Sequence, residues 1–256
     1  MANNKLIIDA ETWLYRCASA AEHEVEWFTD VWTYSCNIGC AKDAFALEME
    51  RLQQACPDHA MTIVLGSGTN FRYAVYKDYK ANRRKLRRPA GYQALRQWVA
   101  DCWATESLDH VEADDVCGII YEPGDVICSR DKDLMTLPGL HLTPEGEVVE
   151  VTTAEADFHF HVQTLTGDST DGYPGIKGVG PVAAKKALSG AVDATDMWDA
   201  VLRTYTSKGH GYDYALQMAR CARILRAGEY DHNAGRPILW NPPTRCQNKH
   251  PLPEWA

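Results

Sequence analysis

Eight carboxylate side chains follow one another along the chain in short, closely spaced groups. They are Asp9, then Glu112, Asp114 and Asp115 in VEADDV, then Asp131 and Asp133 in SRDKD, then Asp168 and Asp171 in TGDSTDG. If the groups converge, their charges repel and raise one another's pKa values, so only cations hold them ionised together. Carboxylate-rich sites without His or Cys favour Mg²⁺ or Mn²⁺ over zinc. The pattern therefore predicts a site for divalent cations.

Each acidic pair also has a structural explanation when it is taken alone. Asp168 and Asp171 are residue types that form turns. Glu112 and Asp115 lie three residues apart, as on one face of a helix whose N-terminus favours acids. The metal site is preferred for the ordered set as a whole, beside the basic segment and the glycine motif described next.

The basic residues are concentrated between residues 72 and 96, although the whole chain has a net charge of −9. This segment holds nine of the 26 Lys and Arg residues: Arg72, Lys77, Lys80, Arg83, Arg84, Lys85, Arg87, Arg88 and Arg96. Four tyrosines interleave with them, namely Tyr73, Tyr76, Tyr79 and Tyr92. Basic side chains among aromatic rings are typical of nucleic-acid binding. A solvated helix face, or a nuclear-localisation signal in KANRRKLRR, would explain the charges alone.

A glycine-rich string, GIKGVGP, begins at Gly175 and leads into the predicted helix VAAKKAL. Glycines at Gly178 and Gly180 let a backbone approach a phosphate, and a helix that opens at Pro181 points free N–H groups toward it. Lys177, Lys185 and Lys186 add positive charge. We interpret the string as a hairpin between two helices that binds a duplex backbone. A generic connection between helices is the alternative.

Short apolar runs predict the strands that position these acids. The runs are residues 5–9 (KLIID), 61–65 (MTIVL) and 125–129 (DVICS). Residues 41–55, between the first two, have helical apolar spacing. Such a pattern indicates an α/β fold with a mostly parallel central sheet and helices on both faces. Ligands bind such sheets off the carboxyl ends of the strands, where Asp9 and Asp131 are expected.

The pattern becomes helical from residue 154 onward. The expected helices are residues 154–166, 181–188, 195–205 and 212–227. We therefore predict an α/β core over residues 1–153, a helical region over 154–240 and an extended Pro-rich tail over 241–256.

Composition places the chain among ordinary globular proteins. Its 256 residues are 45% hydrophobic and 24% charged. No apolar run approaches the length of about 18–20 residues that a bilayer span requires. The N-terminus has no secretory pattern, so an intracellular protein with reduced thiols is expected. Cys36 and Cys40 could suggest a zinc site with His23, but the spacing is not a zinc knuckle and no second pair follows. We interpret the cysteines as small buried hydrophobes.

Taken in order, these motifs resemble the flap endonuclease and 5′–3′ exonuclease family, in its phage and bacterial branch. The resemblance covers about residues 5–190: the strand ending at Asp9, Phe71-Arg72 followed by YKANR, VEADD, the pair Asp131 and Asp133, TGDSTDGYPGIKGVG, and a Lys-bearing helix. It implies a two-metal phosphodiesterase with a helical arch, here about residues 72–96, and a helix-three-turn-helix motif that often binds K⁺. The compact length resembles phage replication exonucleases.

The resemblance also implies a role for each site residue. Asp9, Asp114, Asp115 and Asp131 would contact two cations, and Glu112, Asp133, Asp168 and Asp171 would act partly through waters. Lys80 and Arg83 would neutralise the scissile phosphate, and Tyr79 would stack on the terminal base. The expected nucleic-acid contacts are Arg72, Lys77, Arg84, Lys85, Arg87, Arg88, Gly175, Lys177, Gly178, Gly180, Lys185 and Lys186.

The implied substrate is duplex DNA with a 5′ end or flap, and RNA primers in RNA–DNA hybrids are an open alternative. The implied location is the cytoplasm of a bacterial host. Replication proteins are possible partners that the sequence does not identify. One departure concerns the metal site, because Ser67 stands where members usually carry an aspartate. A PIN-type ribonuclease and a non-catalytic structure-specific DNA-binding protein are the alternative functions. A PIN-type ribonuclease lacks a hairpin like that at Gly175 to Gly180. A non-catalytic DNA-binding protein is conceivable because Ser67 replaces an acid of the metal site.

Overall fold

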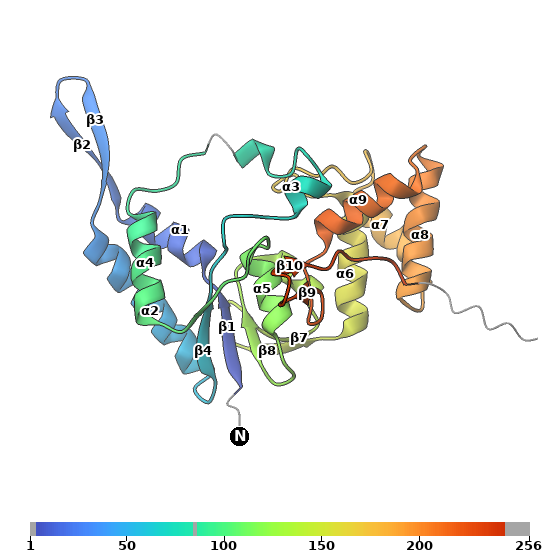
Figure 1. Cartoon of the computed structure of the whole chain (residues 1–256), viewed down its shortest axis with the longest axis horizontal. Coiled ribbons are helices and arrows are strands. Elements are labelled where there is room, and N and C mark those ends of the chain that lie inside the picture. Colours follow the sequence, from blue (N-terminus) through green and yellow to red (C-terminus); the bar gives the residue numbers. More distant parts are fainter. Residues whose placement is uncertain (1–3, 84–85, 244–256) are drawn as a thin grey trace, which may run out of the picture.

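A six-stranded mixed sheet forms the centre of the molecule, in a computed structural model that describes residues 4–83 and 86–243 (Figure 1). Its strand order is β5-β4-β1-β6-β7-β8. The strands are β1 (Lys5–Asp9), β4 (Ala60–Val64), β5 (Thr105–Glu106), β6 (Val126–Cys128), β7 (Gly139–Leu142) and β8 (Val148–Val151). All neighbours are parallel except β7 and β8, which pair antiparallel. The three strands expected from apolar runs lie side by side at its centre.

Helices cover both faces of this sheet. They are α1 (Glu11–Ala20), α2 (Ile38–Ala55) and α4 (Tyr92–Cys102) on one face and α5 (Ala113–Ile120) on the other. Successive residues of β1 alternate between the faces: Ile8 packs in the cluster with α1, α2 and α4, and Ile7 packs in the cluster with α5. Because both faces are buried, the strands are continuously apolar rather than alternating. The predicted α/β fold is confirmed.

The helical region follows as α6 (Thr153–Thr166), α7 (Pro181–Leu188), α8 (Ala194–Ser207) and α9 (Tyr212–Ala222), packed around its own apolar core. The last helix ends earlier than expected. From Arg223 the backbone is extended, and Ile224 and Leu225 return to pack with α5. A small antiparallel pair, β9 (Tyr230–Asp231) and β10 (Arg236–Pro237), continues this return. Among the described helices, none combines the length and apolar composition that a membrane span requires.

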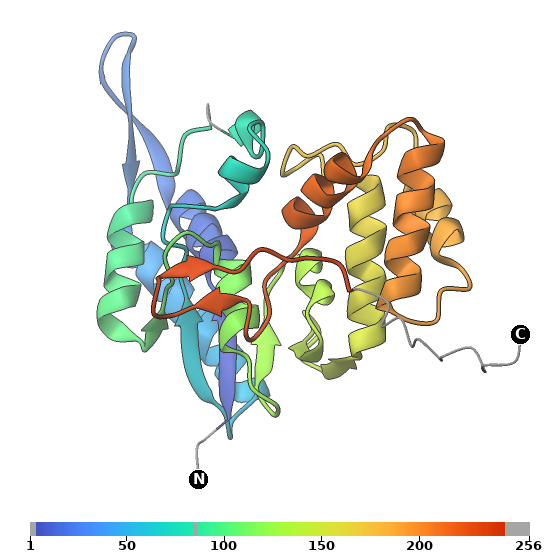
Figure 2. The same cartoon turned by 45° about the vertical axis from the view of Figure 1, so that its right-hand side comes forward.

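The basic segment crosses from the sheet to the helical region and back (Figures 1 and 2). It contains the short helix α3 (Arg72–Val75) and one 3₁₀ turn, η1 (Ala81–Arg83), and α4 begins only at Tyr92. The described part of the predicted arch is therefore helical only in short pieces. Pro89 contributes to this, since a proline disfavours helix in the residue before it. Arg84 and Lys85 lie outside the described residues, as does the predicted tail beyond residue 243.

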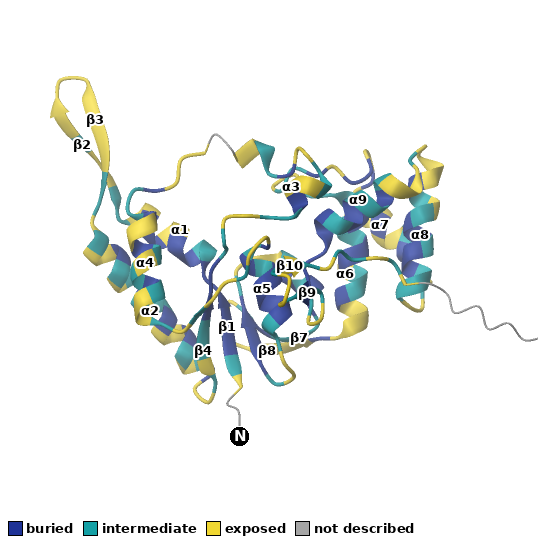
Figure 3. Cartoon of the chain, in the orientation of Figure 1, coloured by how far each residue is buried: buried dark blue, intermediate teal, exposed yellow. Residues whose placement is uncertain are grey.

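A β-hairpin that the sequence reading did not anticipate projects from the body between α1 and α2 (Figures 1 and 3). It consists of β2 (Glu22–Phe28) and β3 (Val31–Cys36). Its aromatic side chains are exposed, Phe28 by 75% and Trp27 by 63%. The cysteine that follows, Cys40, is exposed too, as is Cys102, so the expectation of buried cysteines is wrong for these two.

Candidate active site

Acidic residues gather at the carboxyl end of β1 and β6, where the sequence placed them. The side chain of Asp9, the last residue of β1, is 2% exposed and accepts a hydrogen bond from Ser129 Oγ at 2.9 Å. Asp131 lies three residues after the end of β6, and its Oδ1 accepts from the backbone N–H of Asp133 at 2.9 Å. The N-terminus of α5 adds Glu112 and Asp114.

Mutual repulsion among these acids is evident from their pKa values. Burial, with the charges of Glu11 and Asp131, raises the pKa of Asp9 from 3.8 to about 6. Burial and the charges of Asp9 and Glu112 raise the pKa of Asp114 well above its ordinary value. Asp114 makes no hydrogen bond or ion pair within the described residues, so its charge is left unbalanced by direct contact.

Asp133 and Asp168 join this acidic group from two different regions. Burial and the charge of Asp131, with a hydrogen bond to Asp168, raise the pKa of Asp133 to about 7. Asp168 keeps a lowered pKa despite its burial, because backbone N–H groups, first that of Thr170 at 2.6 Å, donate to it. Asp168 is thus a turn former and a neighbour of the other acids at once.

Glu112 and Asp171 are neutralised by basic and hydroxyl groups. Lys80 Nζ bonds Glu112 and lies 3.6 Å from Asp171 Oδ2. The Tyr79 hydroxyl lies 2.9 Å from Glu112 Oε2 and 2.7 Å from Asp171 Oδ2, and Arg83 Nη2 donates to Asp171 Oδ1 at 2.8 Å. Tyr79 is only 1% exposed, so the predicted stacking on a terminal base is wrong in this structure.

Asp115 and Arg72 form a buried ion pair rather than reaching cations or nucleic acid. The guanidinium contacts both Asp115 oxygens, at 2.7 and 2.8 Å, and the two side chains are 0% and 2% exposed. The same carboxylate accepts from the N–H groups of Glu112 and Leu225, each at 3.0 Å. The predicted metal contact of Asp115 and nucleic-acid contact of Arg72 are contradicted, because neither side chain is accessible and their polar atoms are occupied.

The remaining basic residues of the segment lie at the surface. Lys77, Arg87 and Arg88 are exposed. Arg87 is held at the base of the hairpin, where Glu22 accepts from both Nη atoms at 2.6 and 2.7 Å and the guanidinium lies 3.8 Å from the Tyr34 ring centroid. These residues lie at the surface, and their predicted contact with nucleic acid stays a prediction.

The glycine motif contains two kinds of glycine. Gly175 is buried, and a Cβ on it would lie 2.2 Å from the backbone nitrogen of Gly167, so it serves close packing and not the predicted phosphate contact. Gly178 and Gly180 are exposed, with open space around each. Three exposed lysines accompany them: Lys177, Lys185 and Lys186. The exposed part of the motif keeps its predicted role as a prediction.

Glu11, which sequence reasoning did not single out, lies beside the acidic group. It is the first residue of α1, and its Oε1 accepts from the backbone N–H of Gly66 at 3.0 Å. Its own N–H lies 3.3 Å from Asp9 Oδ1. Its position two residues after Asp9, at the start of a helix, was the available signal.

The donor set fits hard divalent cations. Its members are carboxylates, and burial, together with repulsion from neighbouring acids, raises the pKa values of Asp9, Asp114 and Asp133. Among the described residues no three His, Cys, Asp or Glu side chains stand close enough to hold one ion as they are. Short side-chain movements toward a cation would be needed to complete a coordination shell.

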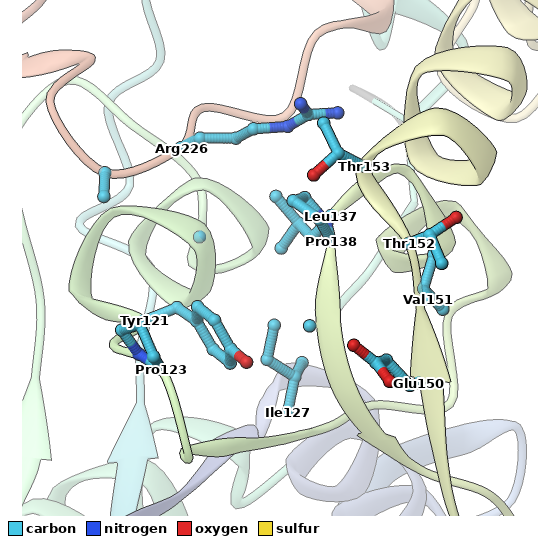
Figure 4. A pocket seen from close by; sticks show the side chains of 13 residues that line it. Tyr121, Pro123, Ile127, Leu137, Pro138, Glu150, Val151, Thr152, Thr153 and Arg226 are labelled. Carbon is cyan, nitrogen blue, oxygen red and sulfur yellow. The ribbon is translucent and has the colours of Figure 1, made fainter.

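None of these acids lines the pocket shown in Figure 4. It has a volume of about 400 Å³ and is lined by residues such as Tyr121, Glu150 and Arg226, where β7 begins and β8 ends. That edge of the sheet is opposite to the carboxyl ends of β1 and β6. No predicted site residue lines this pocket.

An acidic group at the end of a parallel sheet, flanked by a basic segment and a helical region, is the arrangement of a nuclease that acts on a phosphate backbone. The model of the 5′–3′ exonuclease N-terminal resolvase-like domain matches residues 4–161. The chain therefore belongs to the 5′–3′ exonuclease family and is a nuclease.

Relatives and solved structures agree with this assignment. The chain is 27% identical to the exodeoxyribonuclease of Enterobacteria phage T3, over 93% of this chain and 92% of that protein. It is 26% identical to the exonuclease of Escherichia phage T7, over 93% of each chain. Its fold is similar to that of the phage T5 D15 protein co-crystallised with metal ions, with a TM-score of 0.62 and 14% identity over 86% of this chain and 89% of that one.

Proposed function

We propose that the protein hydrolyses phosphodiesters at or near the 5′ end of duplex DNA, using two divalent cations held by its acidic group. The observation that carries this proposal is the convergence of carboxylates from four separate segments, with three raised pKa values, beside Lys80 and Arg83. A purely structural role would not explain acids that repel one another.

Asp9, Asp114 and Asp131 are the residues that would hold the cations directly, and Asp133 and Asp168 would hold bound waters. Bound Mg²⁺ or Mn²⁺ supplies an activated water and stabilises the charge of the leaving oxygen. The carboxylates that hold the cations would position the water relative to the scissile bond.

Lys80 and Arg83 would attract the scissile phosphate to this position. Lys80 is 14% exposed. Burial lowers its pKa, whereas the neighbouring charges of Glu112 and Asp171 raise it, and the net result is a raised pKa. It therefore stays a cation at neutral pH. A phosphate that approaches would compete with these carboxylates for its ammonium group.

The exposed glycines and lysines at the start of α7 would bind the duplex backbone away from the cut. The N-terminus of this helix has no side-chain cap, so its N–H groups are available to phosphate oxygens. Finer features of this proposal are K⁺ at this motif, cleavage of the RNA strand of RNA–DNA hybrids, contact with replication proteins, and a place in the cytoplasm of a bacterial host.

The test is Mg²⁺-dependent release of nucleotides from a 5′-labelled duplex. Asp131→Ala should lower turnover by roughly a hundredfold or more while duplex binding stays measurable. Asp58→Ala, at an exposed position far along the chain from the acids, is the control and should act like the wild type. Undiminished turnover of the Asp131 variant would exclude the proposed role of these acids.

A further inference from the structure

We propose that Glu11 supplies the carboxylate that Ser67 lacks, and that it holds one of the two cations together with Asp9. This inference rests on the proposed function. It assigns a metal ligand to a residue outside the acidic motifs.

Ser67 itself is poorly suited to the task. Ser67 is half-buried, and its hydroxyl is already engaged, 3.2 Å from Thr69 Oγ1 in its own loop and 3.5 Å from the carbonyl oxygen of Val111, the residue before Glu112. A serine also adds no negative charge, and a hard divalent cation is held mainly by anionic oxygens. The end of β4 therefore brings no acid of its own to the site.

Glu11 reaches this loop from the first turn of α1, directly after the neighbouring strand β1. Its Oε1 accepts from the N–H of Gly66, the residue directly before Ser67, and lies 3.5 Å from the point that a Cβ on Gly66 would occupy. Asp9 and Val64 are paired at the ends of β1 and β4. The Glu11 carboxylate thus lies over the β4 end, beside Asp9, whose pKa its charge helps to raise.

The carboxylate is also held in place and accessible. The Tyr92 hydroxyl donates to Oε2, and Arg96 Nε lies 3.9 Å from Oε1. The side chain is still 35% exposed, so an ion can approach it. An alternative role is purely mechanical, in which Glu11 only ties α4 to the loop at Gly66. The two roles are distinguished by a variant that removes the charge of Glu11 but keeps its hydrogen bond to Gly66, because only a metal ligand needs the charge.

The experiment titrates Mn²⁺ alone into the DNA-free full-length protein, with calorimetry as the readout. Glu11→Gln keeps an oxygen for the Gly66 N–H but removes the charge, and should weaken one Mn²⁺ site by roughly tenfold or more. Ser67→Asp in the Glu11→Gln background should restore affinity to within about threefold of the wild type. Tyr92→Phe, which removes the tie but keeps the charge, should stay within the same range.

Each outcome decides the matter. Wild-type affinity in Glu11→Gln, equal weakening by Tyr92→Phe, or no restoration by Ser67→Asp would overturn the inference. Circular dichroism and thermal unfolding without metal verify that each variant is folded. Failure of the proposed function would show itself separately, as a wild-type protein that does not cleave a 5′-labelled duplex in Mn²⁺ or Mg²⁺.

Discussion

The acids of the site differ in pKa because they differ in partners. Glu112 has a lowered pKa although it is buried, since Lys80 and Arg72 favour its charged form. Asp9 has one hydroxyl donor and one backbone donor, and these do not offset its burial. When ionised, acids such as Asp9, whose partners do not offset burial, destabilise the folded protein, and a bound cation would relieve this destabilisation.

This difference predicts how stability depends on pH without metal. Asp9 and Asp133 have pKa values of about 6 and 7 when folded, against 3.8 ordinarily. Between about pH 5 and 7 these two acids therefore bind more protons in the folded state, so their contribution to stability falls as pH rises and levels off above this window. Asp9 alone accounts for about 3 kcal/mol at most. Burial lowers the pKa of His141, and that of His161 to about 4, so these two histidines act in the opposite sense in the same window, and a comparison with an Asp9 variant isolates the part of the acid. Acids with lowered pKa values also act in the opposite sense, but below this window.

Urea unfolding in EDTA, measured from pH 5 to 8, checks this expectation. Asp9→Asn removes the falling contribution of Asp9, so the stability of this variant relative to the wild type should rise with pH across the window, and Mg²⁺ should stabilise the wild type most at the upper end. A difference between the two proteins that does not change with pH would refute the raised pKa of Asp9.

The residue types of the site could be predicted from the sequence, but their partners could not. Asp115 belongs to the same VEADD string as Asp114. Asp115 is paired with Arg72, whereas Asp114 lies near the other acids. Adjacent residues of a helix point in different directions, and only the position of Arg72, 43 residues away, determines which acid is neutralised. Glu11 was missed because it is a single acid without a motif.

Helix α7 and the turn before it form the element that most directly tests duplex binding. Gly180 and Gly211 are the N-cap residues of α7 and α9 and share an extended backbone, with φ of −89° and −86°. Neither has an atom within 4 Å of a built Cβ. A side chain at either position is thus tolerated by the fold, but only one position adjoins the predicted phosphate contact.

We expect Gly180→Leu to weaken binding to duplex DNA by roughly tenfold, because the side chain blocks the approach of a phosphate to the helix N-terminus. Gly211→Leu should bind like the wild type. Fluorescence anisotropy in Ca²⁺, with thermal unfolding as the folding check, compares the two. Equal affinities would remove α7 from the duplex interface.

Elements with a buried apolar face were predictable, whereas the β2–β3 hairpin was not. Buried runs such as residues 5–9 stand out in the sequence, and the sheet confirms them. The hairpin has no core to face, so its aromatic and acidic residues lack the pattern of a half-buried strand. A weaker signal was present: Thr29 and Asp30 form a two-residue turn between β-prone runs, with Asp30 at φ of 64°.

At the scale of the whole molecule, Arg72 joins the α/β core to the helical region. Beyond Asp115, its guanidinium donates to the carbonyl oxygens of Cys221 and Arg223 at the end of α9. The predicted division at residue 153 thus separates two parts that are joined by buried hydrogen bonds of one arginine.

Arg72→Met should lower the free energy of unfolding by about 3–5 kcal/mol, because it leaves Asp115 buried without a counter-charge. Arg51→Met is the control: its partner Glu48 and Arg51 itself are exposed by 36% and 49%, and the loss should be about 0.5 kcal/mol or less. Urea unfolding followed by both fluorescence and circular dichroism gives the two values. A loss of comparable size in both variants would contradict the weight given to burial.

The Arg72 contact also has a consequence for synthesis. Arg72 and Arg223 are 151 residues apart, and at about 5–20 residues per second a ribosome needs about 8–30 s to bring the second after the first. During this interval the nascent chain holds a guanidinium whose last partners do not yet exist, and α5, which carries Glu112 and Asp114, is not yet anchored by Leu225. We expect the nascent nuclease to remain inactive until Leu225 has been made and has left the ribosome, so that nucleic acid near the ribosome is not cut by an incomplete enzyme.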